Sequence, residues 1–283
     1  MSALPFELEQ DIFENAANSD RRSALNLALV AQRVRFWVEP VIYNCVALQY
    51  GGSDSARVLE GFISAMKTKP ASFFARYVKT LLLSDIPACF MMEILAVCTG
   101  ITDLRVWPYT PSAVAQFVVA SSIRPTHLSF SAEQLAAHSR APNFALPFYQ
   151  ELTHLELHDT WGQLMAWAPN FAMLPQLTHL AFVFGSPFSS GAIASYALSA
   201  ILVNCSKLKV CVLRCILSED ELRFGQDAAI AKSITDPRVV VVGWRRSQAR
   251  WAGGQNQNGT CLSCSNVRTK MPVDIYARCR HIL

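Results

Sequence analysis

A spaced apolar pattern repeats along most of this 283-residue chain and constrains its fold more than any other feature. Each copy reads apolar-x-x-apolar-x-apolar, and its alternation is typical of a short strand that is buried on one face. Six copies recur at steps of 23 to 31 residues, and their first positions are Val78, Ile101, Pro125, Leu152, Leu177 and Leu208. Residues 43–48 fit an opening copy, and residues 238–242 fit a closing strand. The repetition predicts a stack of small units, because one such unit cannot bury its apolar face alone.

The period and the strand signature resemble those of leucine-rich repeats. This resemblance implies an α/β solenoid over residues 49–244, irregular in its repeats, with parallel strands inside and helices outside. Return helices are expected at 56–66, 90–97, 114–121, 162–168, 192–203 and 220–230. The asparagine that usually follows the last apolar position of such repeats is missing. Chance repetition in a leucine-rich chain is the alternative, although five steps of similar length do not favour it.

The first 48 residues follow a different pattern. Residues 4–8 read Leu-Pro-Phe-Glu-Leu and open a short amphipathic helix. Asp20 is suited to cap a second helix, which is predicted to continue to Pro40 before a Tyr-x-x-Val-x-Leu strand. A module of about 45 residues cannot bury all of its apolar side chains by itself. They therefore either share one core with the rest of the chain or form a surface for a partner.

This N-terminal segment resembles an F-box, in the form that fungal F-box-like proteins carry. The resemblance implies a three-helix module over residues 1–48 that docks on a Skp-type adaptor protein and, through it, on a cullin. The adaptor-binding residues would be Leu4, Pro5, Leu8, Ile12 and Val30. The sequence departs from the family in two places. Val34 stands where many F-boxes have a tryptophan, with Trp37 one turn later, and the polar link at 15–23 is longer than usual.

Side-chain alternation assigns two rows of residues to the exposed face of the expected sheet. The third positions of the copies are Thr80, Asp103, His127, His154, His179 and Val210, and the fifth positions are Leu82, Arg105, Ser129, Glu156, Ala181 and Val212. The three histidines could hold a metal ion, but adjacent parallel strands place rings side by side rather than around one point. Mutual repulsion would lower their pKa values, so a ladder of neutral rings is the favoured interpretation. The residues expected to contact a target protein are Asp103, Arg105, His127, His154, Glu156 and His179.

Residues 245–283 are predicted to form a flexible tail that ends in a short helix over 274–283. The tail contains four residues that could bind zinc, namely Cys261, Cys264, Cys279 and His281. The first two have zinc-ligand spacing, whereas one residue separates the last two, which is short for two ligands of one ion. A zinc site and incidental cysteines are both open interpretations, and no metal or other cofactor is assigned.

Composition and motifs exclude several classes of function. No uninterrupted run of about 18 apolar residues predicts a membrane span, and no secretory signal is recognised at the start. The net charge of +4 is too weak and dispersed to favour nucleic acid. An intracellular chain, cytoplasmic or nuclear, with reduced cysteines is expected.

Catalysis is not expected either, because the chain has no Gly-x-Ser-x-Gly, phosphate-loop or Gly-x-Gly-x-x-Gly motif. The F-box resemblance instead implies a non-catalytic substrate receptor in the ubiquitin-conjugation pathway. In that role, the N-terminal module holds the adaptor and the repeats hold a target protein. A leucine-rich-repeat scaffold that binds proteins without any ubiquitin-ligase role is the alternative.

Overall fold

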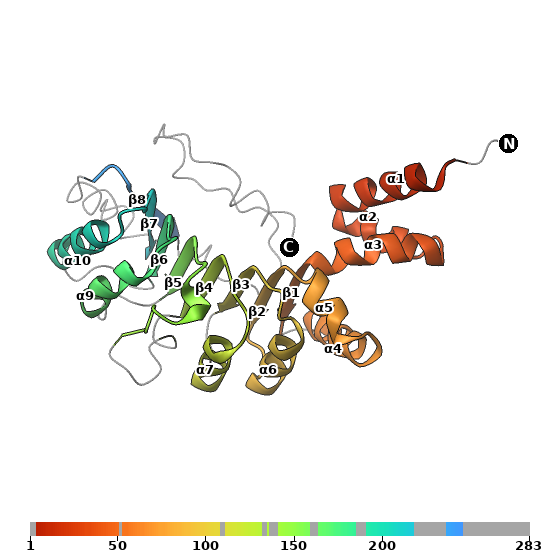
Figure 1. Cartoon of the computed structure of the whole chain (residues 1–283), viewed down its shortest axis with the longest axis horizontal. Helices are drawn as coiled ribbons and strands as arrows, with labels where there is room; N and C mark the ends of the chain where they lie inside the picture. The colour runs from red at the N-terminus through yellow and green to blue at the C-terminus, as the bar shows by residue number, and fades with distance from the viewer. Residues whose placement is uncertain are drawn as a thin grey trace.

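A parallel sheet is the backbone of the structure, a computed structural model that describes residues 4–50, 53–107, 111–131, 135, 141–158, 164–184, 191–217 and 236–245. Within these residues, eight strands form one sheet in which each strand pairs in parallel with the next strand along the chain (Figure 1). The strands are β1 (Cys45–Gln49), β2 (Thr80–Ser84), β3 (Asp103–Trp107), β4 (His127–Ser131), β5 (His154–His158), β6 (His179–Phe184), β7 (Val210–Leu217) and β8 (Val239–Arg245). The expected α/β architecture with a parallel sheet, including its opening and closing strands, is confirmed.

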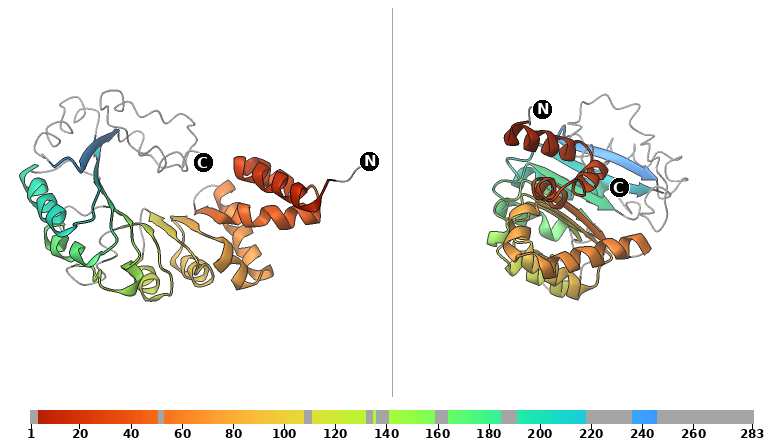
Figure 2. Two further views of the ribbon diagram at one scale, coloured as in Figure 1. Left: turned by 45° about the horizontal axis from the view of Figure 1, so that its top comes forward. Right: turned by 90° about the vertical axis from the view of Figure 1, so that its right-hand side faces the viewer.

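Helices cover one side of this sheet, and Figure 2 shows that the sheet bends into an arc with the helices on its outer side. They are α4 (Ser53–Thr68), α5 (Ala71–Tyr77), α6 (Ala88–Val97), α7 (Ser112–Ala120), η1 (Pro147–Tyr149), α9 (Leu164–Trp167), η2 (Ala168–Met173) and α10 (Gly191–Asn204). The return helices predicted at 56–66, 90–97, 114–121 and 192–203 are confirmed.

Two return segments differ from the prediction. The helix expected at 162–168 is wrong in part, because α9 gives way at Ala168 to the 3-10 helix η2, whose first turn contains a proline. α5 was not expected at all, and it adds a second helix between β1 and β2. The helix predicted at 220–230 lies outside the described residues.

The core lies between the sheet and its helices, and the apolar positions of the repeated pattern build it. The register stacks like on like: Leu128 pairs with Leu155, which pairs with Leu180. These anchor positions are buried throughout the stack. Large rings such as Trp167 and Phe74 fill the space under the helices and are fully buried. Burying one such side chain contributes about 1.5–3 kcal/mol, so the stack is stabilised along its whole length.

The first helices form a module beside the end of the sheet (Figure 1). In residues 4–44, all of which are described, they are α1 (Phe6–Ser19), α2 (Arg21–Leu27) and α3 (Gln32–Asn44). The module has its own small core, made of Ala17, Ala24, Val34, Trp37 and Val38. Asp20 caps α2 as predicted, since its carboxylate accepts a hydrogen bond of 2.8 Å from the backbone N–H of Ser23.

The prediction of one helix continuing to Pro40 is wrong. α2 ends at Leu27, and α3 begins at Gln32 and runs through Pro40 to Asn44. A proline inside a helix loses one backbone hydrogen bond and costs about 3 kcal/mol. Packing offsets this cost, because Ile42 lies against the small core and Tyr43 lies against the repeat core. Tertiary contacts thus override the local signal.

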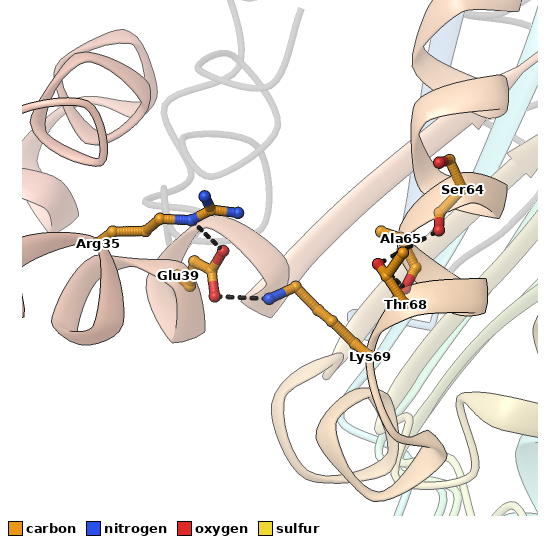
Figure 3. A network of polar contacts seen from close by, with 6 residues as sticks. All are labelled: Arg35, Glu39, Ser64, Ala65, Thr68 and Lys69. Atoms are coloured by element: carbon orange, nitrogen blue, oxygen red, sulfur yellow. Dashed lines mark hydrogen bonds and ion pairs between the residues drawn. The ribbon is translucent and has the colours of Figure 1, made fainter. Parts of the chain in front are cut away.

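α3 joins the module to the repeats through polar and aromatic contacts. Glu39 accepts hydrogen bonds from Arg35 Nε at 2.8 Å and from Lys69 Nζ at 2.7 Å (Figure 3). The same Lys69 ammonium lies 4.6 Å from the ring centre of Phe73. Tyr43 meets the rings of Phe73 and Phe74 edge to face. One continuous helix therefore contributes side chains to both cores.

Candidate functional site

Helix α1 carries apolar side chains on two opposite faces. Phe6 and Phe13 lie against Trp37 of α3, with ring centres 5.0 and 6.2 Å apart. Leu8 and Ile12 are spaced four residues apart, and 3.6-residue periodicity puts them on the face away from that core. They remain 51% and 56% exposed. A helix that is apolar on two faces needs a second surface to cover it.

All five residues expected at an adaptor interface are exposed in the structure: Leu4, Pro5, Leu8, Ile12 and Val30. Pro5 directly precedes the first residue of α1. Two further apolar side chains that were not expected are more exposed still, Leu29 at 85% and Phe36 at 77%. Leu29 lies in the turn between α2 and α3, and Phe36 lies on α3, whose residues Val34, Trp37 and Val38 are buried. The module thus exposes more apolar surface than the resemblance suggested.

On the sheet, His127, His154 and His179 stack as the register predicts. Their strands pair residue by residue, and the ring centres are 4.0 Å and 4.1 Å apart. The planes are inclined by 17° and 3°, so the rings are nearly parallel. The three residues form a continuous ladder, which we call the histidine ladder. The predicted side-by-side arrangement is confirmed.

A threonine precedes each of these histidines and fixes its ring. The hydroxyls of Thr126, Thr153 and Thr178 lie 2.8–2.9 Å from the Nδ1 atoms of the histidines that follow them. Each hydroxyl also donates to a main-chain oxygen of the preceding unit at 3.0–3.1 Å, for example Thr153 to Thr126. A hydroxyl has one hydrogen to donate, so a hydroxyl that gives it to the main-chain oxygen accepts from Nδ1–H; the tautomer of each ring is assigned from this geometry. This threonine row was not predicted, although the Thr-His pair recurs in three successive copies.

The ladder is held in its neutral form. Burial, together with the neighbouring rings His127 and His179, lowers the pKa of His154 from its ordinary value of 6.5 to about 4. Burial also lowers the pKa of His127, where the charges of Asp103 and Arg105 act in opposite directions. Burial and the charge of Lys209 lower the pKa of His179. All three rings are therefore uncharged near neutral pH, as predicted, but burial rather than mutual repulsion is the main cause.

The two carboxylates expected beside the ladder, Asp103 and Glu156, are each paired with an arginine. Arg105 binds Asp103 through two hydrogen bonds, Nε to Oδ1 at 3.0 Å and Nη2 to Oδ2 at 2.8 Å. Glu156 accepts a hydrogen bond of 3.2 Å from Arg214, a residue that the expected site did not include. Two such pairs on the inner face give it a charge pattern with no dominant sign. The face as a whole would therefore select a partner by the positions of individual groups rather than by net charge.

A polar cluster on neighbouring strands contains the buried residues His158 and Ser129 together with Trp107. Trp107 Nε1–H donates to Nδ1 of His158 at 2.9 Å, and the Nε2 of that ring lies 2.9 Å from the hydroxyl of Ser129. Because Nδ1 accepts from the indole, the neutral ring carries its hydrogen on Nε2. His158 and Ser129 are both buried. The cluster ties β3, β4 and β5 together. Ser129 was assigned to the exposed row, and that expectation is wrong because the ring of His158 helps to bury it.

The described ranges hold no group of three or more His, Cys, Asp or Glu side chains that could hold a metal ion. The predicted zinc residues Cys261, Cys264, Cys279 and His281, like the predicted tail from residue 246 onward, lie outside those ranges. Among the described residues, no helix is long and apolar enough to cross a membrane.

Several cysteines behave as small apolar residues. Burial raises the pKa of the Cys98 thiol to about 12 and that of the Cys205 thiol to about 11, so both stay protonated. Cys89 is different, because it is exposed on α6 and contributes nothing to the core.

Comparison with known proteins yields no match: no protein-family model, no curated protein and no solved structure is similar to this chain. What its two exposed surfaces can do must therefore be argued from their own geometry and chemistry.

Proposed function

We propose that this chain is a non-catalytic substrate receptor of a Skp–cullin–F-box ubiquitin ligase. The N-terminal module would bind a Skp-type adaptor in the manner of an F-box, and the inner face of the sheet would hold a target protein. The observation that carries this proposal is α1, whose exposed apolar face lies opposite the face that packs on the module's own core. The fungal F-box resemblance of residues 4–48 supports the same assignment.

The exposed set has the composition of an interface. Leu8 and Ile12 are each about half exposed, and covering their exposed halves would contribute about 1 kcal/mol apiece. Acidic residues of α1, Glu7 and Glu9 among them, surround this apolar face with a polar rim. An apolar centre within a polar rim is the usual organisation of a protein interface. Leu29 and Phe36 would extend the contact beyond the family's usual residues.

The joint between the module and the repeats supports a positioning role. A receptor without chemistry of its own can act only by raising the local concentration of its target near the conjugating enzyme. This effect depends on a fixed geometry between the two binding surfaces. α3 enters both cores, and the Glu39–Lys69 pair ties it to the repeats. A rigid arm of this kind suits the proposal.

The alternative is a scaffold that binds proteins on its sheet without any adaptor. The histidine ladder and its charged neighbours would serve both functions equally. Only the N-terminal module separates them, because a scaffold has no need for a second apolar face on α1. We favour the receptor for that reason.

Binding of a Skp-type adaptor to the full chain tests the proposal. The key variant combines Leu8→Gln with Ile12→Gln, since glutamine keeps the helix propensity and removes the apolar contact. Val203→Gln is the matched control, because Val203 is 82% exposed on α10 in the repeats. Isothermal titration should show binding by the wild type and the control, and a loss of at least about tenfold in the double variant. A folded wild-type chain that binds no Skp-type adaptor would favour the scaffold.

A further inference from the structure

The histidine ladder has a chemical polarity that follows from its threonines. Each threonine hydroxyl gives its hydrogen to a main-chain oxygen and accepts from Nδ1–H of the next ring. In a neutral imidazole the hydrogen on one nitrogen leaves a lone pair on the other, so Nε2 is an acceptor in all three rings. Among the described residues, nothing donates a hydrogen bond to these Nε2 atoms. The ladder thus presents three acceptors and no donor.

The spacing of these acceptors is set by the stack. The rings of His127 and His154 are nearly parallel, 4.0 Å apart, and tied back in the same way. Equivalent atoms of the two rings are therefore separated by about the same distance. A planar guanidinium carries five N–H donors in a rigid fork and can donate to two acceptors so placed. A carboxylate or phosphate oxygen would instead meet lone pairs.

Charge selects one end of the ladder. Asp103 lies beside His127 in the register, and its charge acts on both His127 and His154. Lys209 acts on His179 at the other end. Arg105 binds the Asp103 carboxylate and reduces its field without cancelling it. A cation is therefore best placed over His127 and His154, away from Lys209.

We propose that the His127–His154 end of the ladder binds an arginine side chain of the target, so that the receptor recognises a basic peptide segment. This inference rests on the proposed role of the sheet as the target-holding face. It excludes a phosphorylated or acidic segment at this position, because the locked rings have no hydrogen to offer it. Acidification should release the peptide, since protonated rings would repel the guanidinium. The charges of Asp103, Arg105 and Lys209 also act on the protonation of these rings.

The first test is the hydrogen position itself. Long-range proton–nitrogen NMR spectra of the labelled full chain at pH 7.5 should show Nδ1–H and a bare Nε2 for His127 and His154. Nε2–H on these rings would overturn the proposal. The double variant Thr126→Val and Thr153→Val removes both hydroxyls and frees the rings, whereas the matched double variant Thr126→Ser and Thr153→Ser keeps them.

The second test uses three eight-residue probe peptides of glycine and serine that carry two arginines, two glutamates or one phosphoserine. The arginine peptide should bind the wild type and the serine variant and shift the Nε2 signals. Its affinity for the valine variant should fall about tenfold, the effect of one charge-assisted hydrogen bond. Tighter binding of the glutamate or phosphoserine peptide, or equal affinity for both variants, would refute the proposal. None of these readouts involves the adaptor, so failure here and failure of adaptor binding are distinguishable.

Discussion

Replacing Glu39 by glutamine should weaken the joint between the module and the repeats. The carboxylate accepts from Arg35 at 2.8 Å and from Lys69 at 2.7 Å, and its side chain is only 16% exposed. Glutamine keeps the shape but offers one neutral oxygen to two cations. Partly exposed ion pairs contribute up to about 1 kcal/mol each. We therefore expect the free energy of unfolding to fall by about 1–2 kcal/mol at pH 7.5.

The contribution of Glu39 to the free energy of unfolding should depend on pH. Burial alone would raise the pKa of Glu39, but hydrogen bonds from Lys69 and Arg35 outweigh it and hold the pKa below its ordinary value of 4.5. A lowered folded-state pKa contributes stability that is present above 4.5 and lost as the pH falls through the folded value. The difference between wild type and variant should therefore be full at pH 7.5 and should shrink below pH 4.5.

A double-mutant cycle with Lys69→Met measures the pair itself. Urea unfolding at pH 7.5 should give a coupling free energy of about 0.5–1 kcal/mol between the two sites. Glu60→Gln is the matched control, because Glu60 is exposed on α4, and it should change stability by less than about 0.5 kcal/mol. Additive single effects, or a loss from Glu39→Gln that persists unchanged at low pH, would refute this explanation of the joint.

Four further predictions concern residues of the repeats. A β-carbon on Gly100 would lie 1.8 Å from the Ala75 carbonyl oxygen, so Gly100→Ala should cost more than about 2 kcal/mol in thermal or urea unfolding. Gly61→Ala meets nothing within 4 Å inside α4 and should instead stabilise by about 0.5–1 kcal/mol. Phe74→Ala empties a fully buried site and should cost about 3–5 kcal/mol by the same assay. NMR titration should place the pKa of His154 near 4, below its ordinary value of 6.5. Because the folded state resists protonation of this ring, the free energy of unfolding should fall as the pH drops from 6.5 toward 4. His154→Gln should flatten that dependence on pH.

The strands and their exposed rows were predictable because both follow from period-two alternation. Once Leu128, Leu155 and Leu180 are assigned to the core, the histidines between the anchors must face outward and lie in register. Helix limits were harder to predict. α3 passes through Pro40 because contacts from two cores outweigh the local cost, and no window of sequence contains those contacts.

The candidate site shows a similar division. Its residues were predictable from the repeat positions, but their pairing was not, because Arg214 reaches Glu156 from a strand two places away in the sheet. The threonine row was visible in the sequence as a recurring Thr-His pair. The pattern of apolar positions does not reveal such a pair, because the threonine hydroxyl bonds to a main-chain oxygen of the preceding unit. Polar side chains beside strand starts therefore need to be compared across copies as well as along the chain.

The recurrence of the Thr-His pair also explains the length of the histidine ladder. The Thr-His pair occurs in three successive units, which gives three acceptors at steps of 4.0 and 4.1 Å. In the preceding unit Thr102 is followed by Asp103, and in the following unit Lys209 is followed by Val210. One end of the row is therefore anionic, and the other is cationic and apolar. Changing a single residue after a strand-leading threonine would lengthen or shorten the acceptor row by one step, so a stacked fold can alter what it recognises without altering its core.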